Sequence, residues 1–79
     1  MTSTERHVRL VRHCLAAGMT RDAASTLVQR WEKELADRAC DPSALAFVLA
    51  TRARVGTREA EALGDIMAAE VAGEGLVTA

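Results

Sequence analysis

The chain has 79 residues, of which 49% are hydrophobic and 27% are charged, and its formal net charge is −1. This length corresponds to one small domain, and the composition excludes a wholly disordered chain. The longest uninterrupted apolar run, Ala44 to Ala50, is far shorter than the roughly 20 residues that span a membrane, so we expect no membrane contact.

Short breaks divide the sequence into four segments with helical periodicity. The predicted helices cover residues 4–17, 20–38, 42–54 and 57–73. The residues expected to cap the last three at their N-termini each carry a side-chain oxygen: Thr20, Asp41 and Thr57. Gly18 and Gly56 suit the left-handed position that follows the C-terminus of a helix. No segment alternates apolar and polar residues as a strand does, so no strand is predicted.

Apolar residues at helical spacing define the expected core. The shared face of the first segment is Val8, Val11 and Leu15, with Leu10, Cys14 and Ala17 beside it. In the second segment Trp31 lies on an apolar stripe with Val28 and Leu35. The third segment is apolar nearly all round, so we expect it to be the most buried helix.

The connections between the segments are short, which favours antiparallel neighbours. The sequence therefore predicts an all-α fold, a compact bundle of about four helices in a single domain over residues 1–79. Residues 1–3 and 74–79 are expected to fray, because the helical pattern is lost after Gly73. A chain this short buries a limited core, so we expect either a marginal monomer or a homodimer and favour the homodimer.

Residues that could carry catalysis or bind a metal are scarce. The chain has two cysteines and two histidines, and their spacing is not typical of a zinc site. No glycine-rich phosphate motif occurs, and Cys14 and its neighbour His13 point about 100° apart on a helix, so they do not pair as nucleophile and base. We therefore expect no enzyme activity, no cofactor and no metal. The N-terminus lacks the apolar core of a signal peptide, so both thiols are expected to be reduced in a cytoplasmic protein.

Charge is unevenly distributed along the chain. Residues 1–30 contain five arginines and two acids, whereas residues 59–79 contain five acids and neither Lys nor Arg. Arg6, Arg9 and Arg12 recur every three residues and form a basic stripe, which suits nucleic-acid phosphates. The alternative for this stripe is a solvated outer face of the first helix. The pI of about 6.1 is lower than is typical of a dedicated nucleic-acid-binding domain.

The leading hypothesis is a protein–protein interaction module that acts as a regulator, adaptor or inhibitor of a larger protein machine, phage-type inhibitors of a host system included. The residues expected to contact the partner are Arg6, Arg9, Arg12, Trp31, Glu59, Glu61 and Asp65. Trp31 has two interpretations, a core residue or an aromatic anchor of an interface. The alternative function is a nucleic-acid-binding regulator that uses the basic first helix.

Overall fold

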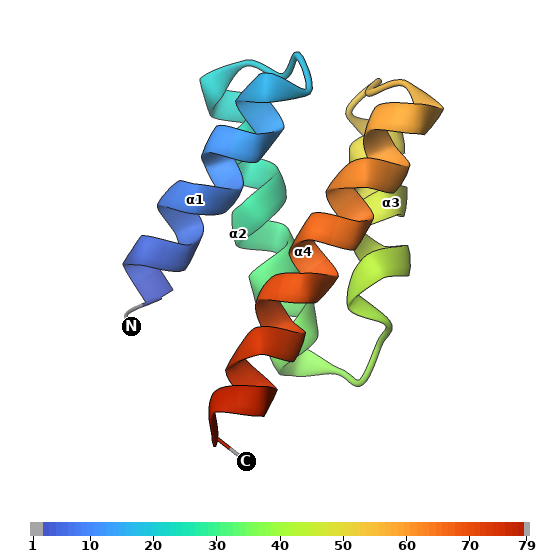
Figure 1. The fold of residues 1–79 in the computed structure, drawn as a ribbon. Helices are drawn as coiled ribbons and strands as arrows, with labels where there is room; N and C mark the ends of the chain where they lie inside the picture. The colour runs from blue at the N-terminus through green and yellow to red at the C-terminus, as the bar shows by residue number, and fades with distance from the viewer. Residues whose placement is uncertain (1–2, 79) are drawn as a thin grey trace.

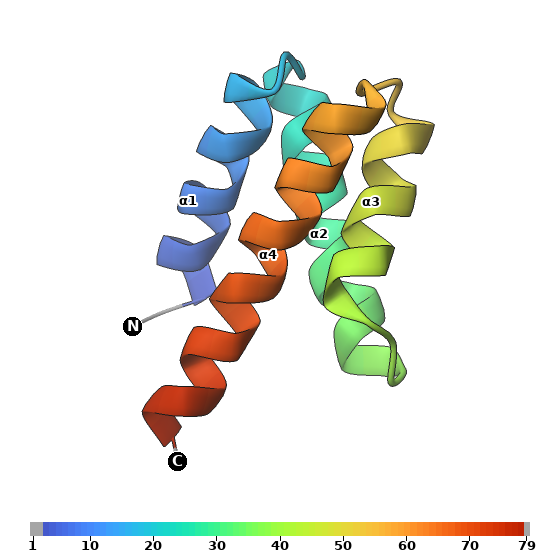
Figure 2. The same cartoon turned by 45° about the vertical axis from the view of Figure 1, so that its right-hand side comes forward.

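The computed structural model describes the backbone of residues 3–78 and the side chains of residues 5–72. Residues 3–78 form four helices, α1 (Ser3–Ala16), α2 (Arg21–Asp37), α3 (Pro42–Arg52) and α4 (Thr57–Thr78). The helices run alternately up and down, and α4 returns beside α1 (Figures 1 and 2). The all-α bundle predicted from the sequence is therefore confirmed.

Side-chain caps begin two of the helices as predicted. The Oγ1 atom of Thr20 accepts a hydrogen bond from the backbone amide of Ala23 at 3.2 Å. The Oδ1 atom of Asp41 accepts one from the amide of Ser43 at 3.3 Å. Each bond satisfies an amide that would otherwise have no partner in the first turn.

The start of α4 differs from the prediction. Thr57 was expected to be the cap, but it is already the first helical residue. The carbonyl of Gly56 accepts the first helical hydrogen bond, from the amide of Ala60 at 2.8 Å. The helix α4 therefore begins one residue earlier than the Thr57 hydroxyl suggested.

The turn after α1 follows the predicted glycine pattern. Gly18 has a φ of +97°, a left-handed conformation that costs glycine little. The amide of Met19 donates to the carbonyl of Cys14 at 3.2 Å, and the amide of Gly18 donates to that of Leu15 at 3.0 Å. This pair of bonds is a Schellman motif, which satisfies the last carbonyls of the helix.

The same motif closes α3, but at an unexpected residue. The amide of Val55 donates to the carbonyl of Ala50 at 3.1 Å, and the amide of Arg54 donates to that of Thr51 at 3.0 Å. Arg54 occupies the left-handed position with a φ of +67°. The prediction that Gly56 fills this position is wrong. An L-residue with a side chain pays about 1–2 kcal/mol for this conformation.

The core is built around Trp31, whose side chain has no exposed surface. Its Nε1 atom donates a hydrogen bond to the carbonyl of Pro42 at 3.0 Å, which ties α2 to the first turn of α3. Leu10, Leu63 and Met67 are equally inaccessible and come from α1 and α4. All four helices thus contribute to one core, because α3 adds its own buried residues.

The orientation of α1 about its axis differs from the prediction. Val8 and Leu15, expected to lead the core face, are 43% and 37% exposed. Leu10 and Cys14, expected beside that face, are completely buried instead. Burial also raises the pKa of the Cys14 thiol to about 11, which leaves it neutral and unreactive near neutral pH.

The third helix is less buried than its composition suggested. Its buried residues are Ala46, Leu49 and Ala50, whereas Val48 is 42% exposed. An outer helix of a small bundle can bury only the side that faces its neighbours. One apolar side of α3 therefore faces solvent, although α3 still has the largest share of buried residues among the described parts of the four helices, as predicted.

The fourth helix is longer than predicted. It continues to Thr78 rather than ending near residue 73. Glycine lowers helix stability by about 1 kcal/mol relative to alanine but does not by itself end a helix, and no proline follows. The expectation that the chain ends fray falls partly on residues 1–2 and 79, which lie outside the described residues.

The closest approach of α3 and α4 depends on a buried glycine, Gly64. A Cβ atom at this position would lie 2.9 Å from the backbone carbonyl oxygen of Ser43. We predict that Gly64→Ala lowers the free energy of unfolding by about 1 kcal/mol, because the overpacking cost exceeds the gain in helix propensity. Urea unfolding monitored by circular dichroism measures this change.

Gly56→Ala is the matched control, since its added Cβ would meet only the movable carboxylate of Glu59. It should lower the free energy of unfolding by only about 0.5 kcal/mol, the cost of alanine in place of glycine at the N-cap of α4. A Gly64→Ala protein more stable than the wild type would contradict the close approach of the two helices.

Candidate functional site

The basic stripe of α1 turns inward at its first arginine. The Nη2 and Nε atoms of Arg6 lie 3.0 and 3.3 Å from the same carboxylate oxygen of Glu32 on α2. The Nδ1 atom of His7 lies 3.5 Å from the other oxygen of Glu32. Both partners of the Arg6–Glu32 pair are largely shielded from solvent, so the pair is screened less than a surface ion pair.

The second arginine of the stripe joins α1 to α4. Arg9 donates from Nε and Nη2 to the two carboxylate oxygens of Glu70, at 3.0 and 2.9 Å. This is the two-pronged geometry in which a guanidinium binds a carboxylate most strongly. The hydrogen bonds from Arg9 lower the pKa of Glu70 despite its partial burial, and the charges of Arg6 and His13 act in the same direction.

These contacts change the interpretation of the basic stripe formed by Arg6, Arg9 and Arg12. Arg6 and Arg9 donate hydrogen bonds within the bundle. Their partners, Glu32 and Glu70, lie 26 and 61 positions away in sequence. Arg12 is exposed and forms no ion pair with any residue whose side chain is described. The structure therefore does not bring the three arginines together on one phosphate-facing surface.

The remaining aromatic candidate lies in the core. The indole of Trp31 is fully enclosed, and its one polar group is satisfied by the carbonyl of Pro42. As folded, this side chain offers no surface to a partner. Of the two interpretations of Trp31, the structure shows it as a core residue.

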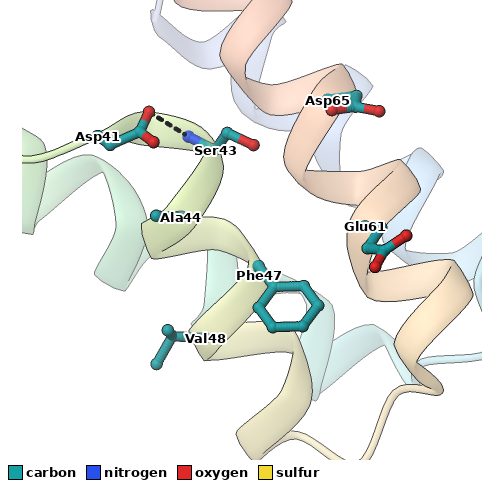
Figure 3. Close-up of a pocket in the computed structure, with 7 residues that line it drawn as sticks. All are labelled: Asp41, Ser43, Ala44, Phe47, Val48, Glu61 and Asp65. Carbon is teal, nitrogen blue, oxygen red and sulfur yellow. Dashed lines mark hydrogen bonds between the residues drawn. The ribbon is translucent and has the colours of Figure 1, made fainter.

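Two of the three acidic candidates line a groove between α3 and α4. Glu61 and Asp65 lie one turn apart on α4, and Asp41 adds a third carboxylate from the start of α3. Figure 3 shows the Phe47 ring extending from α3 toward α4, with Glu61 beside it. The third acid, Glu59, lies in the first turn of α4 and does not line this groove.

The floor of the groove is apolar. Its apolar lining residues are Ala44, Phe47 and Val48, and the groove encloses about 480 Å³. In Figure 3 the Phe47 ring extends toward α4, whereas Val48 points away from α4. Phe47 is half-buried and Val48 is exposed. Among the residues whose side chains are described, no lysine, arginine or histidine lines it. The groove therefore offers an apolar strip bordered by negative charge.

The side chains of this groove offer carboxylate acceptors and apolar surface. Among the described residues, no three His, Cys, Asp or Glu side chains are arranged to hold a metal ion. One oxygen of Asp41 is already occupied as the α3 cap. The carboxylates of Glu61 and Asp65 face solvent and can accept hydrogen bonds from cationic groups.

Sequence reasoning missed Phe47 and Val48 as site residues and assigned them to the core. The available signal was the nearly continuous apolar character of residues 44–50. A helix with more apolar surface than its neighbours can cover leaves some of it exposed, and contiguous exposed apolar surface marks interaction sites.

No protein-family model, curated protein or solved structure matches this chain. Within the described part of the chain, no helix combines the length and the apolar character needed to cross a membrane. The function is therefore argued from the groove and from the distribution of charge.

The Arg9–Glu70 pair gives a prediction about acid stability. Because the native pKa of Glu70 lies below its ordinary value of 4.5, the unfolded chain takes up this proton first as the pH falls. The stabilisation from Glu70 is thus complete above pH 4.5 and is lost progressively below it. We predict that Glu70→Gln lowers the free energy of unfolding at pH 7 by about 1–2 kcal/mol. In this variant the free energy of unfolding should also vary less with pH in the acid range.

Thermal unfolding measured from pH 7 down to the acid range tests this. Glu61→Gln, on the same helix but outside the Arg9–Glu70 pair, should keep the wild-type pH profile. An unchanged profile for Glu70→Gln would show that the ion pair does not stabilise the fold.

Proposed function

We propose that this protein is a protein–protein interaction module whose docking site is the groove between α3 and α4. The partner supplies a basic amphipathic helix. The observation that carries the proposal is that the exposed Val48 and the half-buried Phe47 line one groove together with three carboxylates.

The apolar strip supplies the favourable burial. Val48 and Phe47 lie one residue apart on α3 and both line the groove. A helix laid into an apolar groove presents side chains at i, i+3, i+4 and i+7 to it. Covering these two residues removes apolar surface from water, at roughly 25 cal/mol per Å² before the costs of association.

The acidic border supplies the selectivity. Glu61 and Asp65 are exposed, so they can pair with lysine or arginine side chains on the polar flank of the incoming helix. Such complementary charges raise the association rate and exclude acidic competitors more than they raise affinity. They also repel phosphates, so this groove favours a basic protein segment over a nucleic acid.

In this proposal the chain acts as a regulator, adaptor or inhibitor of the larger protein that carries the basic helix. Nucleic-acid binding through α1 is less well supported, because Arg6 and Arg9 are engaged with Glu32 and Glu70. The homodimer and the cytoplasmic location remain predictions from the sequence.

A model peptide tests the groove directly. The probe is a fluorescein-labelled amphipathic helix of leucine and lysine, and the comparison peptide replaces each lysine with glutamate. We predict that the wild-type protein binds only the lysine peptide. The double variant Glu61→Gln/Asp65→Asn should bind it about tenfold more weakly, which is about 1.4 kcal/mol. Val48→Asp should remove binding, because it places a charge on the apolar floor.

Glu59→Gln is the control, since it removes an exposed acid of α4 that lies outside the groove. It should retain wild-type affinity. Equal binding of the two peptides, or an equal loss in the control, would rule out the groove as the docking site.

A further inference from the structure

One end of the bundle is rich in arginine. The α1–α2 loop and the α3–α4 loop lie at the same end, away from both chain termini (Figures 1 and 2). Four exposed arginines belong to the helix ends and the loop found there: Arg21, Arg52, Arg54 and Arg58. None of the four forms an ion pair with a side chain that the structure describes.

A second groove continues this surface along α2 and α3. It encloses about 360 Å³, and Arg30 and Arg52 border it from the two helices. Asp22 is the one acid among its lining residues. The leucines that line it, Leu27 and Leu49, are almost fully buried. This groove therefore offers positive charge and little apolar surface, unlike the groove between α3 and α4.

The backbone of Arg54 provides an independent observation. Two Schellman motifs close helices at this end, and the first has Gly18 in its left-handed position. The second has Arg54 there, although glycine is the residue that adopts this conformation without strain. Backbone strain of this kind is concentrated at functional sites. The strained position holds a guanidinium-bearing residue in the loop between Arg52 and Arg58.

We propose that this arginine-rich end, formed by Arg21, Arg52, Arg54 and Arg58 and continued along α2 by Arg30, binds the phosphate backbone of duplex nucleic acid. Guanidinium groups match phosphate geometry with paired hydrogen bonds. The N-termini of α2 and α4 meet the C-termini of α1 and α3 at this end, so the partial charges of the helix ends offset one another and the arginines carry the positive charge. The proposal concerns a different face from the α3–α4 groove and does not depend on the function proposed for that groove.

The structure favours a duplex over a single strand. Single-strand binding relies on exposed aromatic side chains on which bases stack. Trp31 is in the core, and Phe47 lies in the other groove. The arginines come from helix ends and a loop, rather than from one helix face that could enter the major groove. Contact is therefore expected with the backbone and without sequence preference.

The experiment measures binding of the full chain to a fluorescein-labelled DNA duplex of mixed sequence and about 20 base pairs, by fluorescence anisotropy. Binding should weaken steeply between about 50 and 200 mM NaCl, because each phosphate contact contributes about −0.9 to the slope of log K against log salt concentration. Arg54→Gly should weaken binding about threefold at the lower salt concentration and reduce the magnitude of that slope by about 0.9.

The same variant separates a functional role from a structural one. Glycine relieves the strained backbone, so Arg54→Gly should raise the melting temperature by a few degrees while it weakens DNA binding. The double variant Arg52→Ala/Arg58→Ala should weaken binding further. Arg38→Ala is the control, because this exposed arginine lies at the opposite end and pairs with Glu34 of its own helix.

Two sets of results would overturn the proposal. The first is no duplex binding at low salt, or an equal loss of affinity in Arg54→Gly and Arg38→Ala. The second is tighter binding of a single-stranded oligonucleotide or of a poly-glutamate peptide than of the duplex, since either would assign this surface to another partner.

Discussion

The placement of α1 depends on two guanidinium–carboxylate pairs. Arg6 binds Glu32 on α2, and Arg9 binds Glu70 on α4, so one short helix is joined to both of its neighbours. These pairs form with Leu10 turned inward and Val8 turned outward, so they favour the observed orientation of α1. They also engage the guanidinium groups of two arginines within the bundle. One set of contacts thus decides both the packing of α1 and the functions it can perform.

The third helix organises the opposite charges of the molecule. On one side it forms the acidic groove with α4, and on the other side it forms the arginine-bordered groove with α2. The net charge of −1 conceals this separation, because it sums the basic and acidic residues of the whole chain. If both proposals hold, a basic protein segment and a nucleic-acid duplex could occupy the chain together, which is the geometry of an adaptor.

Local signals were enough to predict the helices, and long-range contacts were not. Thr20 and Asp41 cap α2 and α3 through bonds that span two or three residues, so the sequence reveals them directly. The orientation of α1 was not readable in this way, because both of its sides carry apolar residues. The choice is made by Glu32 and Glu70, which lie far away along the chain. Likewise, the left-handed residue after α3 follows from where its hydrogen bonds close rather than from the nearest glycine.

The candidate site illustrates a more general limit of apolar patterning. The sequence of α3 shows how much apolar surface the helix carries, but not how much its neighbours can cover. Ala46 and Ala50 face the core, and their small side chains let α3 pack closely there. The larger Val48 is left on the outer side. The apolar surface that α2 and α4 leave uncovered can be identified only when the positions of those helices are known. This uncovered surface is what distinguishes a docking surface from a core.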